Sequence, residues 1–210
     1  MRIIEAIILG IIQGLTEFLP ISSSGHLVIF QQFFNIQEAD VAFDVMLHLG
    51  TLIAVLIYYR KDVLELISEF ILLIGSWIRG ERPKLLEPDR PYRILMIMVI
   101  LATIPTALIG LLFKDIFVKL FNHMNVVGYA LIVTGILLWI SNRFVGNRKK
   151  AENMTILDAL TVGIVQSVAM IPGISRSGST IFAGLFRGFT PEFAARFSFL
   201  LSIPAILGAV

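Results

Sequence analysis

The chain has 210 residues, of which 57% are hydrophobic and only 15% charged. This is more apolar surface than one soluble core could bury, so the composition predicts an integral membrane protein. The apolar runs are continuous and about twenty residues long rather than alternating over about ten, which excludes a transmembrane β-barrel and favours an all-α, polytopic membrane protein. The net charge of +2 is small, and the basic residues gather in loops beside apolar runs, so the sequence predicts no nucleic-acid partner.

The N-terminal segment, residues 3–34, predicts a re-entrant helix hairpin. Residues 3–19 are mostly apolar, and Pro20 disfavours helical geometry in the residue before it. At about 1.5 Å per residue this helix reaches roughly 25 Å, short of a hydrocarbon core of about 30 Å. Ser22, Ser23 and Ser24 offer N-caps for a second short helix, and Gly25 lets the backbone turn. The turn is therefore expected at membrane depth.

Three membrane spans are predicted after the hairpin, over residues 41–59, 94–113 and 124–141. Residues 63–78 carry their charges on one side and predict an interfacial helix rather than a span. Residues 114–123 predict a short surface helix. We assign residues 1–150 to a first repeat and residues 151–210 to a second, which appears shortened at its C-terminus because it ends in apolar sequence without a cap.

The distribution of Lys and Arg predicts the topology. Three loops, at residues 60–61, 79–93 and 143–150, hold eleven of the seventeen basic residues, against two in residues 114–119. If residues 63–78 do not cross the membrane, all three loops lie on the cytoplasmic side. The second hairpin then enters from the opposite face to the first. If residues 63–78 do span, the repeats are parallel and two basic residues move outside.

An internal repeat supports the duplication. A shift of 153 residues places residues 9–26 on residues 162–179 without a gap, with seven identities in eighteen positions. In membrane proteins built from inverted repeats, the binding site lies where two broken segments meet near the midplane. Chance similarity between small-residue apolar helices is the alternative. We expect the two turns to meet and form one site.

The chemistry of the two turns predicts an anion site with a base and a nucleophile. Ser/Gly turns that enter a helix offer free backbone N–H groups to an oxyanion, and Arg176 adds a planar fork suited to phosphate. Ser23 and His26 are three residues apart, so the imidazole can reach the hydroxyl as its base. The remaining candidates for substrate binding are Ser22, Ser24, Gly25, Ser175, Ser177, Gly178 and Ser179.

Gln13 and Glu17 lie four residues apart on one helix face and predict a site for a divalent cation, Mg²⁺ or Ca²⁺, because oxygen ligands suit these ions. A structural ion pair between Glu17 and Arg176 is the alternative for the carboxylate. Asp44 and His48 also share a helix face, and we interpret them as an interhelical polar contact rather than as ligands.

The motifs QGLTEFLPISSSGH and PGISRSGST resemble the two signatures of the undecaprenyl-diphosphate phosphatase family, the bacitracin-resistance proteins of bacterial inner membranes. The resemblance implies a multi-pass protein of the plasma (inner) membrane that hydrolyses the terminal phosphate of undecaprenyl diphosphate, a C55 isoprenoid diphosphate lipid, to recycle the carrier lipid of cell-wall synthesis. It places the family's acidic motif on Gln13 and Glu17, its serine and histidine on Ser23 and His26, and its arginine on Arg176. Gln13 replaces the second glutamate of many members, which removes one carboxylate from the metal site.

Two other functions remain open. An inverted repeat with broken helices is also the plan of a secondary transporter or of a flippase for a phosphorylated lipid, and a lipid-binding scaffold without turnover is the third class. A transporter has no use for a Ser–His pair beside a phosphate-binding arginine, which favours the phosphatase. The sequence also leaves open whether the protein forms a homodimer.

Overall fold

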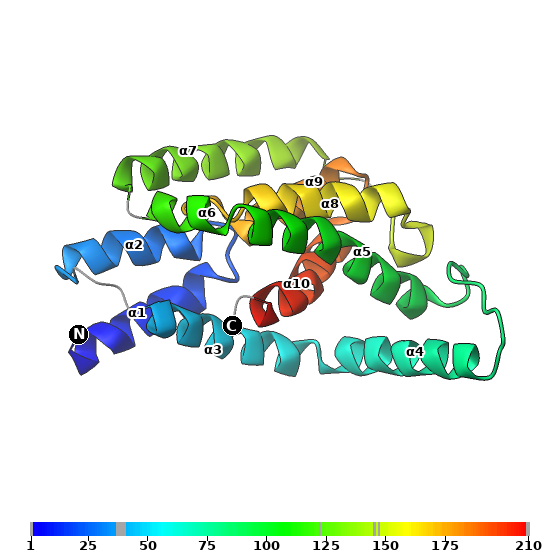
Figure 1. Ribbon diagram of the computed structural model, residues 1–210. Coiled ribbons are helices and arrows are strands. Elements are labelled where there is room, and N and C mark those ends of the chain that lie inside the picture. The colour runs from blue at the N-terminus through cyan, green and yellow to red at the C-terminus, as the bar shows by residue number, and fades with distance from the viewer. Residues whose placement is uncertain (1, 37–40, 122, 145, 147, 209–210) are drawn as a thin grey trace.

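The computed structural model describes residues 2–36, 41–121, 123–144, 146 and 148–208. Within these residues the regular structure is helical, as the composition predicts (Figure 1). Ten α-helices and two short 3₁₀ helices follow one another as α1 Ile3–Thr16, α2 Ser23–Phe33, α3 Val41–Tyr58, α4 Arg60–Ile78, α5 Pro91–Leu112, α6 Lys114–Phe121, α7 Met124–Ser141, η1 Asn142–Phe144, η2 Ala151–Asn153, α8 Ile156–Val168, α9 Arg176–Phe186 and α10 Pro191–Leu207.

Proline positions explain where the two hairpin-forming helices end. Helix α1 was expected to reach Leu19, but it stops at Thr16. The carbonyl of Thr16 would need an N–H from the residue four positions on, which is Pro20 and has none. Helix α8 ends at Val168 for the same reason, because the residue four positions on is Pro172. Each turn therefore begins where a proline removes a hydrogen bond of the helix.

Two helices, α5 and α7, are long and apolar enough to cross a membrane, which confirms helical segments at the predicted spans 94–113 and 124–141. The third predicted span forms α3, and it meets the same test only together with α4, from which it is bent by 83°. The described residues thus contain two such helices, or three if the bent pair is one span. Residues 63–78 are helical, within α4, and their interfacial position stays a prediction. The predicted surface helix is α6, none of whose residues is buried.

The main core forms where α5, α8 and α10 meet. Its centre includes Met98, Ala159, Phe189 and Leu201, all with no exposed surface. Helices α5 and α8 approach closely at Gly163, where a Cβ atom would lie 2.2 Å from the carbonyl oxygen of Ala102. Large hydrophobic side chains on the outer faces of α1, α4, α5 and α7 are exposed instead. This pattern is typical of helices that face lipid, and the chain is a membrane protein.

The two similar segments fold into similar hairpins. Helices α1 and α2 form one and helices α8 and α9 the other, and their turns lie next to each other near the middle of Figure 1. The helices that leave the turns are equally long, with 11 residues each in α2 and α9. The two hairpins therefore share the order and the approximate lengths of their helices.

Candidate functional site

Each turn ends in a serine that caps the following helix. The Ser22 hydroxyl accepts a hydrogen bond from the backbone N–H of Gly25 at 3.2 Å, and the Ser175 hydroxyl accepts one from Gly178 at 3.0 Å. These serines and glycines are equivalent in the 153-residue repeat. The remaining N–H groups of both first helical turns, and the positive ends of both helix dipoles, face the turns. Two preformed anion-binding ends thus lie in one place.

The turns touch each other through small residues. The backbone N–H of Gly173 lies 3.4 Å from the Ser24 hydroxyl, and the Ser177 hydroxyl donates to the carbonyl oxygen of Glu17 at 3.4 Å. A Cβ atom at Gly178 would lie 2.9 Å from the carbonyl oxygen of Pro20. The predicted meeting of the two turns therefore occurs, and it depends on glycine at the contact.

Glu17 connects the two turns. Its carboxylate is only 7% exposed. Oε2 accepts a hydrogen bond from the Ser23 hydroxyl at 2.5 Å and one from the Gln13 side-chain amide at 3.1 Å. Oε1 accepts from the guanidinium of Arg176, which lies 159 residues later in the chain. A carboxylate, a hydroxyl and a guanidinium thus form one hydrogen-bonded group, built from both repeats.

This arrangement differs from the predicted Ser23–His26 pair. The hydroxyl of Ser23 engages Glu17, whereas Nδ1 of His26 lies 2.7 Å from the carbonyl oxygen of Ser22. An Nδ1–H donated to that carbonyl leaves Nε2 of the ring as the nitrogen that can act on a substrate. The carboxylate, rather than the imidazole, is placed to accept the hydroxyl proton here. Whether His26 takes part in the chemistry stays a prediction.

His48 also lies near Glu17, although its sequence context predicted no role in the site. Its Nε2 lies 3.9 Å from Oε2 of Glu17, and its Nδ1 lies 2.8 Å from the carbonyl oxygen of Asp44. The interhelical contact predicted for this pair is confirmed for Asp44, whose carboxylate accepts a hydrogen bond from the Gln31 amide at 2.9 Å. In the sequence, His48 is recognisable only as a histidine one helical turn after Asp44. That spacing does not predict that α3 packs against the first hairpin near Glu17.

The other predicted residues lie at the N-terminal ends of α2 and α9. Gly25 was expected to let the backbone turn, but it is helical, and Ser22 has the positive φ of 70° instead. Gly25 packs so closely that a Cβ atom would lie 2.9 Å from a side-chain carbon of Leu131. Ser175, Ser177 and Ser179 are all buried at the beginning of α9. The second repeat has no carboxylate at the position equivalent to Glu17, because Met170 stands there. The chemistry of the site is therefore asymmetric although its scaffold is duplicated.

The predicted metal ligand Gln13 has a buried amide oxygen, as has Gln166, its equivalent in the second repeat. Oε1 of Gln13 is inaccessible to solvent and has no hydrogen-bond partner among the described residues. Such an atom is typical of a site that takes a cation or an ordered water. In the part of the chain that the structure describes, no three His, Cys, Asp or Glu side chains form a metal-binding cluster. A cation held by Glu17 and Gln13 stays a prediction.

Comparisons with known proteins show the family of this chain. The family model described as "Bacitracin resistance protein BacA" matches residues 6–210. A protein of Alkaliphilus metalliredigens named undecaprenyl-diphosphatase is 47% identical over 210 residues, covering all of this chain and 75% of the relative. Proteins of the same name from Carboxydothermus hydrogenoformans and Methanobrevibacter smithii are 46% and 48% identical, covering all of this chain and 72% and 75% of the relatives. With a family match over nearly its whole length, the chain belongs to the bacitracin-resistance (BacA) family of undecaprenyl-diphosphatases.

Proposed function

We propose that this protein hydrolyses undecaprenyl diphosphate to undecaprenyl phosphate and inorganic phosphate. The observation that carries the proposal is the hydrogen-bonded group of Glu17, Ser23 and Arg176 at the contact between two helix N-termini. It combines a nucleophile, a base and a phosphate-binding cation, which are the parts that phosphoryl transfer needs. The names of the relatives at 46–48% identity support the substrate.

The proposed reaction begins when the terminal phosphate displaces Glu17 from Arg176. The guanidinium then binds the phosphoryl oxygens, and the free N–H groups at the starts of α2 and α9 bind the remaining charge. The Ser23 oxygen attacks the terminal phosphorus while its proton moves to Oε2 of Glu17, 2.5 Å away. The bond between that phosphorus and the bridging oxygen breaks, and undecaprenyl phosphate leaves with the bridging oxygen.

The second half of the reaction returns the site to its starting state. A water molecule attacks phosphoserine, gives one proton to the site and forms the new P–O bond. The Ser23 oxygen leaves and takes back the proton held by Glu17. His26, with its Nδ1 on the Ser22 carbonyl, has Nε2 free to accept the proton of this water. Inorganic phosphate then leaves, the proton on His26 passes to the phosphate or to solvent, and Arg176 pairs with Glu17 again.

We further propose that a divalent cation, Mg²⁺ or Ca²⁺, assists this reaction. Support comes from the buried Oε1 of Gln13, which lacks a hydrogen-bond partner among the described residues, and from the adjacent carboxylate of Glu17. Carboxylate and amide oxygens are the ligands that these ions prefer. When bound, the ion would neutralise charge on the diphosphate.

The membrane arrangement that we propose has the two hairpins as re-entrant segments that enter the plasma membrane of a bacterial cell from opposite faces. Residues 1–150 and 151–210 would then be inverted repeats. The proposal is supported by the shortness of α1 and α8, with 14 and 13 residues, and by the eleven basic residues in three loops. Such an arrangement brings the polar turns together at membrane depth, where irregular backbone must be buried in protein or line a wet cavity.

The direct test uses the purified chain in detergent with farnesyl diphosphate as a short soluble analogue. We expect equal amounts of inorganic phosphate and farnesyl phosphate, with release stopped by a chelator and restored by Mg²⁺. Phosphate release that continues unchanged in excess chelator would show that the reaction needs no divalent cation. If no phosphate is released, but a phosphorylated lipid moves across the membrane of vesicles that contain the protein, the transporter or flippase replaces the phosphatase as the proposed function.

A further inference from the structure

Helix α7 contacts the rest of the protein through one narrow stripe. Of its 18 residues, Val127, Ala130 and Thr134 are buried, and their spacing of three and four places them on one face. This face lies against the second turn, because a Cβ atom at Gly173 would lie 2.6 Å from the carbonyl oxygen of Val127. Thr134 has the one polar side chain of the three and is 4% exposed. The buried face of α7 therefore presents a single hydroxyl to the second turn.

The Thr134 hydroxyl holds the backbone of the second turn. It donates a hydrogen bond to the carbonyl oxygen of Gly173 at 3.0 Å and accepts one from the backbone N–H of Ser175 at 3.0 Å. These two groups flank Ile174, so one side chain fixes the peptide units on both sides of that residue. A threonine within a helix commonly donates to the carbonyl four positions earlier, as Thr103 does on α5. The hydroxyl of Thr134 instead donates to a segment 39 residues later in the chain.

The serine that Thr134 holds differs in backbone conformation from its equivalent in the first turn. Ser175 is extended, with φ −68° and ψ 118°, whereas Ser22 has φ 70° and ψ 93°. Both serines accept the same kind of hydrogen bond from a glycine, so the helix cap alone does not determine this conformation. A residue other than glycine is strained at a φ of 70°. The hydrogen bonds of Thr134 thus restrain the second turn to the unstrained conformation from which Arg176 begins α9.

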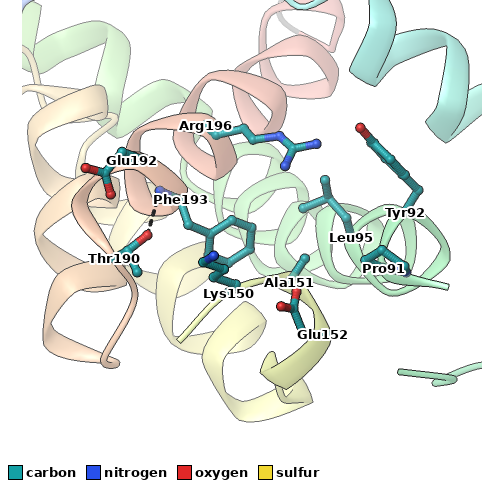
Figure 2. A pocket seen from close by; sticks show the side chains of 10 residues that line it. All are labelled: Pro91, Tyr92, Leu95, Lys150, Ala151, Glu152, Thr190, Glu192, Phe193 and Arg196. Carbon is teal, nitrogen blue, oxygen red and sulfur yellow. Dashed lines mark hydrogen bonds between the residues drawn. The ribbon is translucent and has the colours of Figure 1, made fainter. Parts of the chain in front are cut away.

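Arg176 depends on its backbone more than Arg196 does. The guanidinium of Arg196 pairs with a carboxylate of α4 and lies 5.3 Å from the centre of the Tyr92 ring, toward which it reaches in Figure 2. Both of these partners stay in place. The guanidinium of Arg176 pairs with Glu17 and lies 3.5 Å from the carbonyl oxygen of Ser202. Once a phosphate has displaced Glu17, the position of this guanidinium depends mainly on the backbone at the start of α9.

We propose that Thr134 is a positioning residue for phosphoryl transfer. Its hydroxyl fixes the second turn so that Arg176 and the N–H groups at the start of α9 meet the transferring phosphoryl group. This role rests on the proposed phosphatase activity and adds α7 to the helices that build the site. Thr134 acts through Gly173 and Ser175 and does not itself touch the substrate. A displacement of about 1 Å at a group that binds the transition state can cost about 10²-fold in rate.

The test compares Thr134→Val, which keeps the shape of the side chain but has no hydroxyl, with Thr134→Ser, which keeps the hydroxyl. Phosphate release from farnesyl diphosphate is measured with the purified variants in detergent and Mg²⁺. We expect Thr134→Val to lower kcat by about 10- to 100-fold while KM stays within about threefold, because the fork of Arg176 matters most in the transition state. Thr134→Ser should keep kcat within about threefold of the wild type.

A second measurement needs no turnover. Orthovanadate resembles the phosphoryl group in the transition state, and its binding to each variant is measured by titration calorimetry. The affinity of Thr134→Val for orthovanadate should fall by about the same factor as kcat/KM, whereas Thr134→Ser should bind as the wild type does. If the wild type binds orthovanadate but releases no phosphate, the proposed phosphatase activity fails, and the comparison of affinities still decides the role of Thr134.

Thr106→Val is the matched control. Thr106 is also 4% exposed, and its hydroxyl donates to the carbonyl oxygen of Gly163 at 3.1 Å and accepts from the Gln166 amide at 3.0 Å. These hydrogen bonds join α5 to α8 outside the two turns. Thr106→Val should therefore lower the unfolding temperature but keep kcat and the affinity for orthovanadate.

Four results would overturn the role of Thr134. They are wild-type kcat and orthovanadate affinity in a folded Thr134→Val variant, equal losses in Thr106→Val and Thr134→Val, equal losses in Thr134→Ser and Thr134→Val, and no binding of orthovanadate by the wild type. If Thr134→Val does not fold, Thr134→Ala takes its place in the same comparisons.

Discussion

Replacement of Glu17 by glutamine is the sharpest perturbation of the site. The two side chains have the same size, but glutamine has no charge and its amide does not accept the Ser23 proton. Three donors now converge on the carboxylate, from Ser23 at 2.5 Å, from Gln13 at 3.1 Å and from Arg176. The substitution therefore removes the base and releases the guanidinium in one step.

The expected loss follows from general-base catalysis. Removal of a positioned base costs about 10²- to 10⁴-fold in rate, which is about 3–5 kcal/mol of transition-state stabilisation. Arg176 no longer has Glu17 as a competing partner and remains free to bind the phosphate. We therefore expect kcat to fall by at least about a hundredfold while KM does not rise.

The assay is phosphate release from saturating farnesyl diphosphate, with thermal unfolding to show that the variant is folded. Glu5→Gln is the matched control, because Glu5 is also on α1, is also 7% exposed and also pairs with an arginine, Arg2. This control should keep wild-type turnover. A folded Glu17→Gln variant whose kcat stays within about tenfold of the wild type would refute the assignment of the base.

Arg176→Lys should lower kcat by about 10²- to 10³-fold in the phosphate-release assay, because it keeps the charge but loses the planar fork. Cysteine introduced at Lys119 should react with an impermeant reagent added outside cells, whereas cysteine at Arg148 should not, because the basic loops are expected on the cytoplasmic side. Gly163→Ala should lower the unfolding temperature and cost about 1–3 kcal/mol, since its Cβ would lie 2.2 Å from a carbonyl oxygen of α5, whereas Gly10→Ala, whose nearest neighbour is at 3.9 Å, should be tolerated.

Each of these predictions has a result that contradicts it. Arg187→Lys is the control for Arg176→Lys, because Arg187 lies at the end of the same helix and pairs with Asp158 outside the two turns. Equal effects of the two arginine variants would argue for a general structural role. Labelling at both introduced cysteines, or at Arg148 alone, would reject the inverted topology. Equal stability of the two glycine variants would reject close helix packing at Gly163.

The sequence was sufficient to predict the scaffold of the site. The alignment of the two repeats matches Ser22 with Ser175 and Gly25 with Gly178. In each repeat the serine hydroxyl accepts a hydrogen bond from the backbone N–H of the glycine, so the two helix caps are the same. This was predictable because capping and turn chemistry are local and depend on residues within one turn of helix. The end of α1 at Thr16 was also predictable from the sequence, because Pro20 has no N–H to donate to the Thr16 carbonyl.

The partners of the reactive groups could not be predicted in the same way. A three-residue spacing suggested His26 for the Ser23 hydroxyl, but the hydroxyl engages Glu17 across the turn. His48 comes close to the carboxylate because α3 packs against the first hairpin, and no local pattern encodes that approach. Spacing within one helix limits which side chains share a face, whereas distances across a turn depend on tertiary packing.

We propose that the two turns form one phosphoryl-transfer site in which Ser23 is the nucleophile. The most direct measurement is a rapid-quench reaction of the purified chain with farnesyl diphosphate labelled in its terminal phosphate, followed by peptide mapping. We predict label on the peptide that contains Ser23, and neither label nor rapid turnover in Ser23→Ala. Label on His26, or turnover of Ser23→Ala at the wild-type rate, would contradict it.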